Sequence, residues 1–273
     1  MSIILYRSEA PRPQRPALTG PVLFARYAFG PNRLGLCGPE DWRSLLELGS
    51  AAMGSEAPEG KRAHDIDRGL RDLAAGFEGA FPYLELIAES NNVADPLDLL
   101  VVDAYWIGNT LSDHVDPVLM TYSMGKRFKA QLPADTWKWL QDKPRAGARP
   151  THAFHVFDVF PMIGSRRQGS VADALGLMDA CRIRWGRVME IAGDSLVVNA
   201  VPLELYGGKL ALAKPKVQTV RRWLDGTGFV SDVNVGDVVS LHWDWACEVL
   251  TRSRLEALQR RTARQLELAN QTL

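Results

Sequence analysis

The spacing of apolar residues changes near the middle of the chain. From about 39 to 142, apolar side chains recur every three to four positions, as in Ile66, Leu70 and Phe77. This spacing is the period of an amphipathic helix. No alternating segment interrupts the stretch, so we expect an all-α domain of five or six helices over residues 22–142.

Asp-Pro pairs predict where two of these helices begin. Asp95 with Pro96 and Asp116 with Pro117 each precede an apolar helical repeat. An aspartate accepts hydrogen bonds from the free N–H groups at a helix start, and proline fits the first turn. Pro39 predicts a further start on the same ground.

A different pattern follows residues 143–150, whose prolines, glycine and charges predict a linker. Short β-prone runs then alternate with glycine-containing pairs that are typical of hairpin turns. The runs are 183–191, 195–205, 209–212, 217–223 and 238–243. Five short strands with glycine at the corners predict a small OB-like barrel within a β-rich domain, residues 151–250.

The two ends complete the predicted organisation. Residues 1–21 contain four prolines and three arginines, which predict a flexible arm. Residues 251–273 predict a helix capped by Thr251, with Leu258 and Leu266 on its apolar side. The expected class is therefore α+β: an N-terminal all-α domain, a small OB-like barrel and a C-terminal helix.

Composition narrows the classes of function. The chain has 273 residues, of which 46% are hydrophobic and 23% are charged, as in ordinary globular proteins. Its 32 Lys and Arg balance 32 Asp and Glu, and this zero net charge argues against a general nucleic-acid binder. No apolar run is long enough to predict a membrane span. Three cysteines and the lack of a signal sequence predict a cytoplasmic protein.

The common catalytic motifs are absent, so histidines and cysteines are the remaining candidates. His152 and His155 form H-x-x-H. On a helix they would share a face and hold one metal, whereas on a strand they would point to opposite faces. The Val- and Phe-rich run HAFHVFDVF favours a strand, so each histidine is a candidate metal ligand on its own. Cys37 precedes a predicted helix and is either a reactive thiolate or a small buried residue.

The β-rich part carries a resemblance. Cys181 is followed by Gly-Arg-Val at 186–188, by Gly-Asp at 193–194 and by VGDVVSLH at 235–242. This order resembles the small chaperones of nickel–iron hydrogenase maturation (the HypC/HupF type). The sequence departs from that family in three ways: 180 residues precede the cysteine, Trp185 replaces a proline, and an extra hairpin falls near 203–223.

The resemblance implies a five-stranded OB-like barrel that carries or inserts an Fe(CN)2CO unit. It implies Cys181 as the iron ligand, His242 as the barrel histidine, and the hydrogenase large subunit or other maturation proteins as partners. The whole chain also resembles an uncharacterised bacterial family that shares segments such as FARYAFGPNRLGLCGP, AYWIGN, HAFHVF and CRIRWGRV. We associate that family with hydrogenase gene clusters.

These observations define a candidate site. The predicted metal ligands are Cys181, His242, His155 and His152. A thiolate is a soft donor that suits iron. Arg182 and Arg184 are predicted to share a strand face, where they bind cyanide nitrogens or an acidic partner, or simply face solvent. Trp185 and Trp243 are expected to shield the pocket from water.

Three classes of function remain open. The first, which we favour, is an accessory scaffold of hydrogenase maturation that binds the iron unit and is not an enzyme. The second is a metalloenzyme that uses His152 or His155 with His242 and a cysteine. The third is a nucleic-acid-binding OB-like barrel whose tryptophans stack bases, and zero net charge weighs against it.

Overall fold

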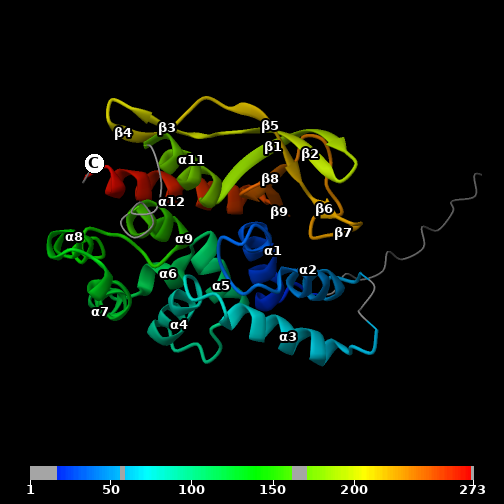
Figure 1. The fold of residues 1–273 in the computed structure, drawn as a ribbon, viewed down its shortest axis with the longest axis horizontal. Coiled ribbons are helices and arrows are strands. Elements are labelled where there is room, and N and C mark those ends of the chain that lie inside the picture. The colour runs from blue at the N-terminus through cyan, green and yellow to red at the C-terminus, as the bar shows by residue number, and fades with distance from the viewer. Residues whose placement is uncertain (1–16, 56–58, 162–170, 272–273) are drawn as a thin grey trace, which may run out of the picture.

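The structure is a computed structural model and describes residues 17–55, 59–161 and 171–271. Most of the predicted N-terminal arm, residues 1–16, lies outside these ranges. In Figure 1 the strands occupy one side of the molecule and the helices of the N-terminal half occupy the other. Of the described helices, none has both the length and the apolar character that crossing a bilayer would require.

All regular secondary structure in the described N-terminal half is helical. Its elements are α1 (Gly20–Arg33), α2 (Trp42–Ala51), α3 (Ala63–Ala75), α4 (Phe81–Ser90), α5 (Leu99–Trp106), α6 (Thr110–His114), α7 (Pro117–Phe128), the 3-10 helix η1 (Lys129–Gln131) and α8 (Ala134–Leu140). The helical character predicted for this half is confirmed. The described part has more helices than predicted. Helix α1 is buried on nearly all sides and α6 has only five residues, so neither shows a clear amphipathic repeat in the sequence.

The predicted helix starts are partly right. Asp116 accepts hydrogen bonds from the backbone N–H groups of Val118 and Leu119, so the start at Pro117 is confirmed. Asp95 instead caps a turn, and α5 begins after Asp98, whose carboxylate accepts from Leu100. Pro39 likewise precedes α2, which begins at Trp42 after the cap Asp41. In both cases the helix begins after an aspartate that follows the predicted start, Asp98 or Asp41, because that aspartate caps the first turn.

Helix α1 lies at the centre of the molecule and is buried along almost its whole length. Its Phe29 ring packs edge-on against Trp245 of the β-rich part, with ring centroids 4.5 Å apart. A Cβ atom at Gly30 would lie 2.6 Å from the carbonyl oxygen of His242. The absence of a side chain at Gly30 therefore lets α1 touch the strands directly, and one hydrophobic core runs across both halves.

Residues 152–160 form helix, so the strand predicted there is wrong. The helix α9 (His152–Phe154) continues into the π-helix η2 (His155–Val159). Thr151 caps α9 by accepting a hydrogen bond from the N–H of Phe154. Val156 and Phe157 are buried. The Val and Phe content of the run therefore reflects burial of a short helix on most sides, which composition cannot distinguish from a strand.

The β-rich part contains nine described strands. They are β1 (Arg184–Ala192), β2 (Ser195–Ala200), β3 (Leu203–Tyr206), β4 (Lys209–Leu212), β5 (Lys216–Arg221), β6 (Trp223–Leu224), β7 (Thr227–Gly228), β8 (Val238–His242) and β9 (Trp245–Val249). Five of them follow the order β1-β2-β5-β9-β8, and β8 pairs back with β1 to close the sheet. The neighbours are antiparallel except β5 and β9, which meet in parallel at Arg221 and Trp245.

Membership of this sheet differs from the prediction. The predicted run 195–205 breaks at Pro202, and β3 pairs with β4 in a separate hairpin. Proline cannot donate to a strand ladder, so the chain leaves the sheet there. β9, which was not predicted as a strand, takes the place of β4. Its residues are buried almost throughout, and it therefore shows no alternation of apolar and polar positions.

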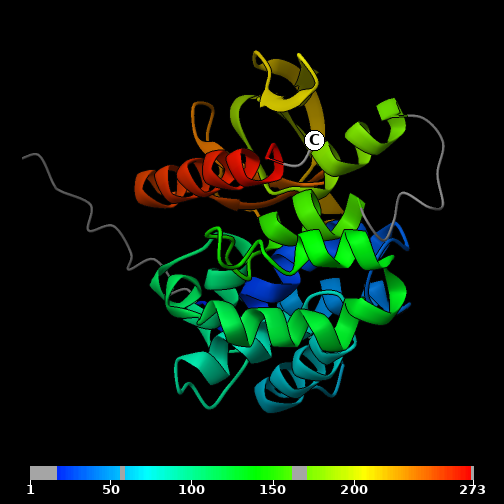
Figure 2. The same cartoon turned by 90° about the vertical axis from the view of Figure 1, so that its left-hand side faces the viewer.

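Two helices flank the strands (Figure 2). Helix α11 (Val171–Cys181) precedes β1, and α12 (Arg252–Ala269) follows β9. Thr251 caps α12 by accepting from the N–H of Arg254, and Leu258 and Leu266 are buried. Both features of this helix were predicted. The α+β class, with a helical N-terminal half, a β region and a C-terminal helix, is confirmed.

Candidate metal centre

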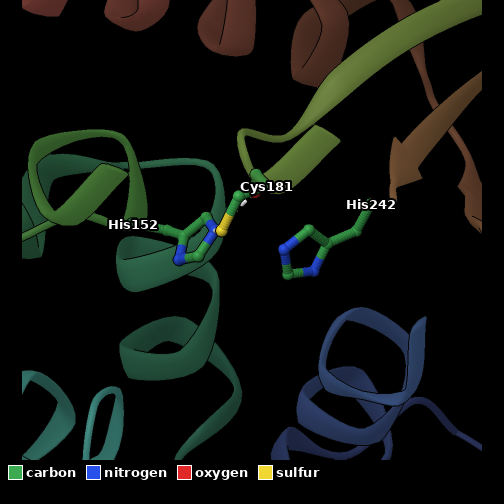
Figure 3. A group of neighbouring side chains, drawn as sticks. All are labelled: His152, Cys181 and His242. Atoms are coloured by element: carbon green, nitrogen blue, oxygen red, sulfur yellow. Dashed lines mark hydrogen bonds between the residues drawn. The ribbon is translucent and has the colours of Figure 1, made fainter. Parts of the chain in front are cut away.

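Three side chains from distant parts of the chain meet at one point (Figure 3). His152 comes from α9, Cys181 ends α11, and His242 ends β8. One ligand atom from each residue lies within 4.8 Å of the other two. Three of the four predicted metal ligands are therefore neighbours, although 90 residues separate the first from the last.

Backbone contacts bring Cys181 to His242. The N–H of Trp243, in the turn between β8 and β9, donates to the carbonyl of Ala180 at 2.7 Å. The guanidinium of Arg184 donates to the carbonyl of Trp243. The end of α11 is thus fastened to the turn that follows His242, and the two candidate ligands are held by the main chain.

The ring of His242 is oriented for metal binding. Its Nδ1 lies 2.6 Å from the carbonyl oxygen of Tyr27 in α1. A carbonyl only accepts, so Nδ1 carries the proton and Nε2 carries the lone pair. Nε2 is buried and has no hydrogen-bond partner in the described part of the chain. A histidine that donates one ring N–H to a carbonyl and presents the other nitrogen is the usual form of a metal ligand.

His152 can present a nitrogen only after a change of tautomer. Its Nε2 lies 2.8 Å from the carbonyl oxygen of Cys181 and 4.0 Å from the thiol Sγ. Its Nδ1 lies 3.2 Å from the Tyr105 hydroxyl. Without metal, Nε2 donates to the carbonyl and Tyr105 donates to Nδ1. With metal on Nε2, Nδ1 would donate to the Tyr105 oxygen, because a hydroxyl serves either tautomer.

Burial sets the protonation of all three groups. It lowers the pKa of His152 to about 4 and that of His242 well below its ordinary value. Both imidazoles are therefore neutral, the form that binds metal. Burial raises the pKa of the Cys181 thiol to about 12, and the Trp243 indole opposes this shift. A metal ion must therefore displace the thiol proton to bind here.

The donor set fits a transition metal. Two imidazoles and one thiolate are ligands for iron, zinc, cobalt or copper, whereas calcium and magnesium require oxygen donors. Three protein ligands leave at least one coordination position for another molecule, as in catalytic zinc sites. The residues present thus fit a first-row transition-metal ion with an open side.

A cavity of about 370 Å³ adjoins the three ligands. Apolar side chains form much of its wall: Leu36, Phe77, Trp106, Phe160, Leu177 and Trp243. Cys37, Tyr105 and His155 add polar atoms. The open side of the candidate centre therefore faces a largely apolar space.

The fourth predicted ligand, His155, lies outside the three-residue group. It begins η2, and its Nδ1 lies 3.4 Å from the Tyr83 hydroxyl. Burial lowers its pKa to about 3. Its ring centroid is 6.4 Å from that of His152, so both histidines of H-x-x-H reach the cavity wall while only His152 reaches Cys181 and His242.

Arg182 and Arg184 are buried, so the interpretation as a solvated strand face is wrong. Arg182 precedes β1 and bonds Asp179 and the carbonyl of Val201. Arg184 bonds Gln218 and the carbonyl of Trp243. Neither is among the described residues of the cavity wall. Both arginines hold elements around Cys181 in place.

The two predicted shielding tryptophans differ in position. Trp243 is half-buried and lines the cavity beside His242. It has a φ of 57°, a left-handed conformation that is uncommon for a bulky residue and is often found at functional sites. Trp185 is 9% exposed and packs in the core below the Arg182 guanidinium, outside the described cavity wall.

Sequence reasoning missed the residues that support the ligands. Tyr27 and Tyr105 orient the two histidines, and the Trp106 ring lies against both, with centroids 4.9 Å from His152 and 5.7 Å from His242. The sequence offered one clue to these residues. Tyr27 lies in FARYAFG, and Tyr105 and Trp106 lie in AYWIGN, two apolar segments that contain several aromatic residues.

The chain was compared with known proteins. No curated protein and no solved structure gives a significant match. The profile of a family of unknown function, DUF6390, matches residues 16–273, which include every residue of the candidate centre. The chain therefore belongs to the DUF6390 family.

Proposed function

We propose that this protein binds one iron ion or iron unit through His152, Cys181 and His242, and that it acts as an accessory protein. The observation that carries the proposal is the meeting of three ligand atoms within 4.8 Å. The unpartnered Nε2 of His242 supports it, since a buried polar atom without a partner is costly unless it has a ligand.

Iron is proposed on two grounds. A thiolate with imidazoles is a donor set that iron accepts. The resemblance around Cys181 and His242 to hydrogenase-maturation chaperones implies Fe(CN)2CO as cargo, and the closed five-stranded sheet is in keeping with the OB-like barrel of that family. The proposed partners are the hydrogenase large subunit or other maturation proteins.

A holding role is favoured over catalysis by the surroundings of the centre. Among the described residues of the cavity wall there is no aspartate or glutamate to act as a general base. His155, with a pKa lowered to about 3, is a weak base. The apolar wall would keep water away from a bound iron unit. The three cysteines form no disulfide, in keeping with the reducing cytoplasm that we propose as the setting.

A metalloenzyme is the second candidate. The observation that favours it is the cavity of about 370 Å³ beside an open coordination position, which is the arrangement of catalytic metal sites. Nucleic-acid binding is not retained. Of the four tryptophans that could stack bases, Trp185 and Trp245 are 9% and 0% exposed. Trp243 lines the cavity, and the half-buried Trp223 ring is covered on one face by the Arg222 guanidinium, so they form no continuous row of exposed rings.

The decisive experiment is metal analysis of the chain purified without oxygen, with infrared spectroscopy for CO and CN bands. We expect one iron per chain in the wild type and a loss of at least tenfold in iron affinity in Cys181→Ser. Cys37→Ser is the matched control, because Cys37 lines the same cavity but lies outside the three-residue group. CO and CN bands support the accessory role, and iron without them supports the metalloenzyme.

Two results would overturn the metal site. One is a chain that binds no transition metal after reconstitution, and the other is equal metal content in Cys181→Ser and the wild type. Hydrogenase activity in cells carrying Cys181→Ser tests the proposed partner. Normal hydrogenase activity in cells whose variant no longer binds metal would reject the role in hydrogenase maturation and leave the metal site standing.

A further inference from the structure

We infer that the cavity beside the candidate metal centre binds a small neutral organic molecule, with an apolar body and one lone-pair donor atom that occupies the open position of the metal. This inference rests on the proposed metal site. It adds the class of ligand that the site admits when the bound metal keeps an open position, as the second candidate function requires.

The volume of the cavity supports a ligand larger than a diatomic molecule. About 370 Å³ lies within the usual range for small-molecule pockets, roughly 300 to 1,000 Å³. His152, Cys181 and His242 all belong to its wall. A ligand that fills the space therefore reaches the metal with one end while its remainder lies against the other walls.

The chemistry of the wall selects an apolar body. Phe77, Phe160 and Leu177 contribute hydrocarbon surface. In the described part of the wall there is no Asp, Glu, Lys or Arg. A charged group on the body of the ligand would lose its water without gaining a counter-charge, and this is costly. The metal is the one strong partner, so the ligand needs a single donor atom placed at one end.

The loop at 34–38 forms a solvent-exposed border of the cavity. Leu36 is 50% exposed and also lines the cavity, so this part of the wall borders solvent. Gly35 and Gly38 flank Leu36 and Cys37, with φ values of 68° and 80°. A side chain at Gly38 would strike the Phe77 ring, whose nearest atom lies 2.3 Å from an added Cβ. The loop therefore packs directly over Phe77 at this border of the cavity.

The test uses the full chain loaded with cobalt(II), whose visible absorption reports both thiolate ligation and changes in coordination. Imidazole and 4-phenylimidazole are titrated at mildly alkaline pH, where both probes are neutral. They present the same donor atom and differ by a phenyl ring. We expect 4-phenylimidazole to bind about 30-fold more tightly, since the buried ring contributes apolar contact.

Filling the cavity should remove this preference. Gly79 lies on the exposed rim of the wall, where an added Cβ meets no atom within 4 Å, so Gly79→Leu is the filling variant at the rim. Gly176→Leu is the matched control, because Gly176 also has open space but lies outside the described wall. Ala80→Leu is a second filling variant, since Ala80 already lines the cavity. We expect the preference to fall below about threefold in both filling variants and to persist in the control.

The outcomes separate the two proposals. If no cobalt absorption develops, the metal site is wrong and this inference fails with it. If cobalt binds with thiolate ligation but the two probes bind equally, or neither binds, the metal site stands and the inferred ligand class is rejected. A preference that survives in both filling variants places the phenyl ring outside the cavity and also rejects the inference.

Discussion

Lowering the pH from 7 to 5 should destabilise the metal-free protein, because its buried histidines stay neutral at pH values where the imidazoles of the unfolded chain become protonated. Burial lowers the pKa of His152 to about 4 and that of His155 to about 3. In the unfolded chain an imidazole has a pKa of about 6.5. The stability that these groups contribute is complete above pH 6.5 and is lost as the pH falls toward their folded values.

The magnitude follows from these values. At pH 5 the unfolded imidazole is protonated while each folded one is still neutral, which lowers the free energy of unfolding by about 2 kcal/mol for each of His152 and His155. His242, whose pKa is lowered further by burial, acts in the same direction. Asp158 acts in the opposite direction. Burial raises its pKa to about 6, so its protonation between pH 7 and pH 5 raises the free energy of unfolding by about 1 kcal/mol. The net loss of about 3 kcal/mol or more is a substantial fraction of the 5–15 kcal/mol that is typical of natural domains.

Urea unfolding at a series of pH values, with a chelator present, measures this dependence. His152→Gln and His155→Gln remove one titrating group each, so each variant should lose about 2 kcal/mol less than the wild type between pH 7 and 5. His64→Gln is the control for the substitution itself, because His64 is exposed. The readout is the slope with pH, so a variant that is less stable at every pH remains informative.

A wild-type free energy of unfolding that stays constant between pH 7 and 5 would refute the reasoning. So would a His152→Gln slope equal to that of the wild type. Either result would mean that the imidazole takes up its proton in the folded protein, and hence that water reaches the candidate centre.

Three further predictions concern the surroundings of the centre. Metal binding should release one proton per ion, because burial raises the pKa of the Cys181 thiol to about 12; calorimetry in buffers of different ionisation enthalpy counts it, and no release would mean that the thiol does not ligate. Trp243→Gly should be about 1 kcal/mol more stable to urea than Trp243→Ala, because φ is 57° at this position; the opposite order would show that the turn relaxes. Arg254→Met should lower the free energy of unfolding by about 3 kcal/mol, since it removes the guanidinium that pairs with the buried carboxylate of Glu248 and with Asp103; a change below about 1 kcal/mol would show that the Tyr27 hydroxyl and the nearby Arg26 suffice.

The sequence by itself determined the features that depend on neighbouring residues. The helical period of the N-terminal half, the cap at Asp116, the cap at Thr251 and the glycine turns of the β-rich part arise from local backbone and side-chain preferences. These local features need no knowledge of distant contacts. The expectation that Cys181 and His242 lie at one site came instead from the resemblance carried by the residues around them.

Tertiary structure alone decided what happens to fully buried segments. The runs at 152–160 and 245–249 are apolar on most sides, so periodicity could not tell that the first is helix and the second a strand. The helical state of the first run turns His152 toward Cys181, and the pairing of β8 with β9 places Trp243 in the turn beside both. Tyr27 and Tyr105 orient the histidines from helices more than 40 residues away in sequence. Such contacts depend on how the helices pack against the strands, and no local preference of either residue encodes them.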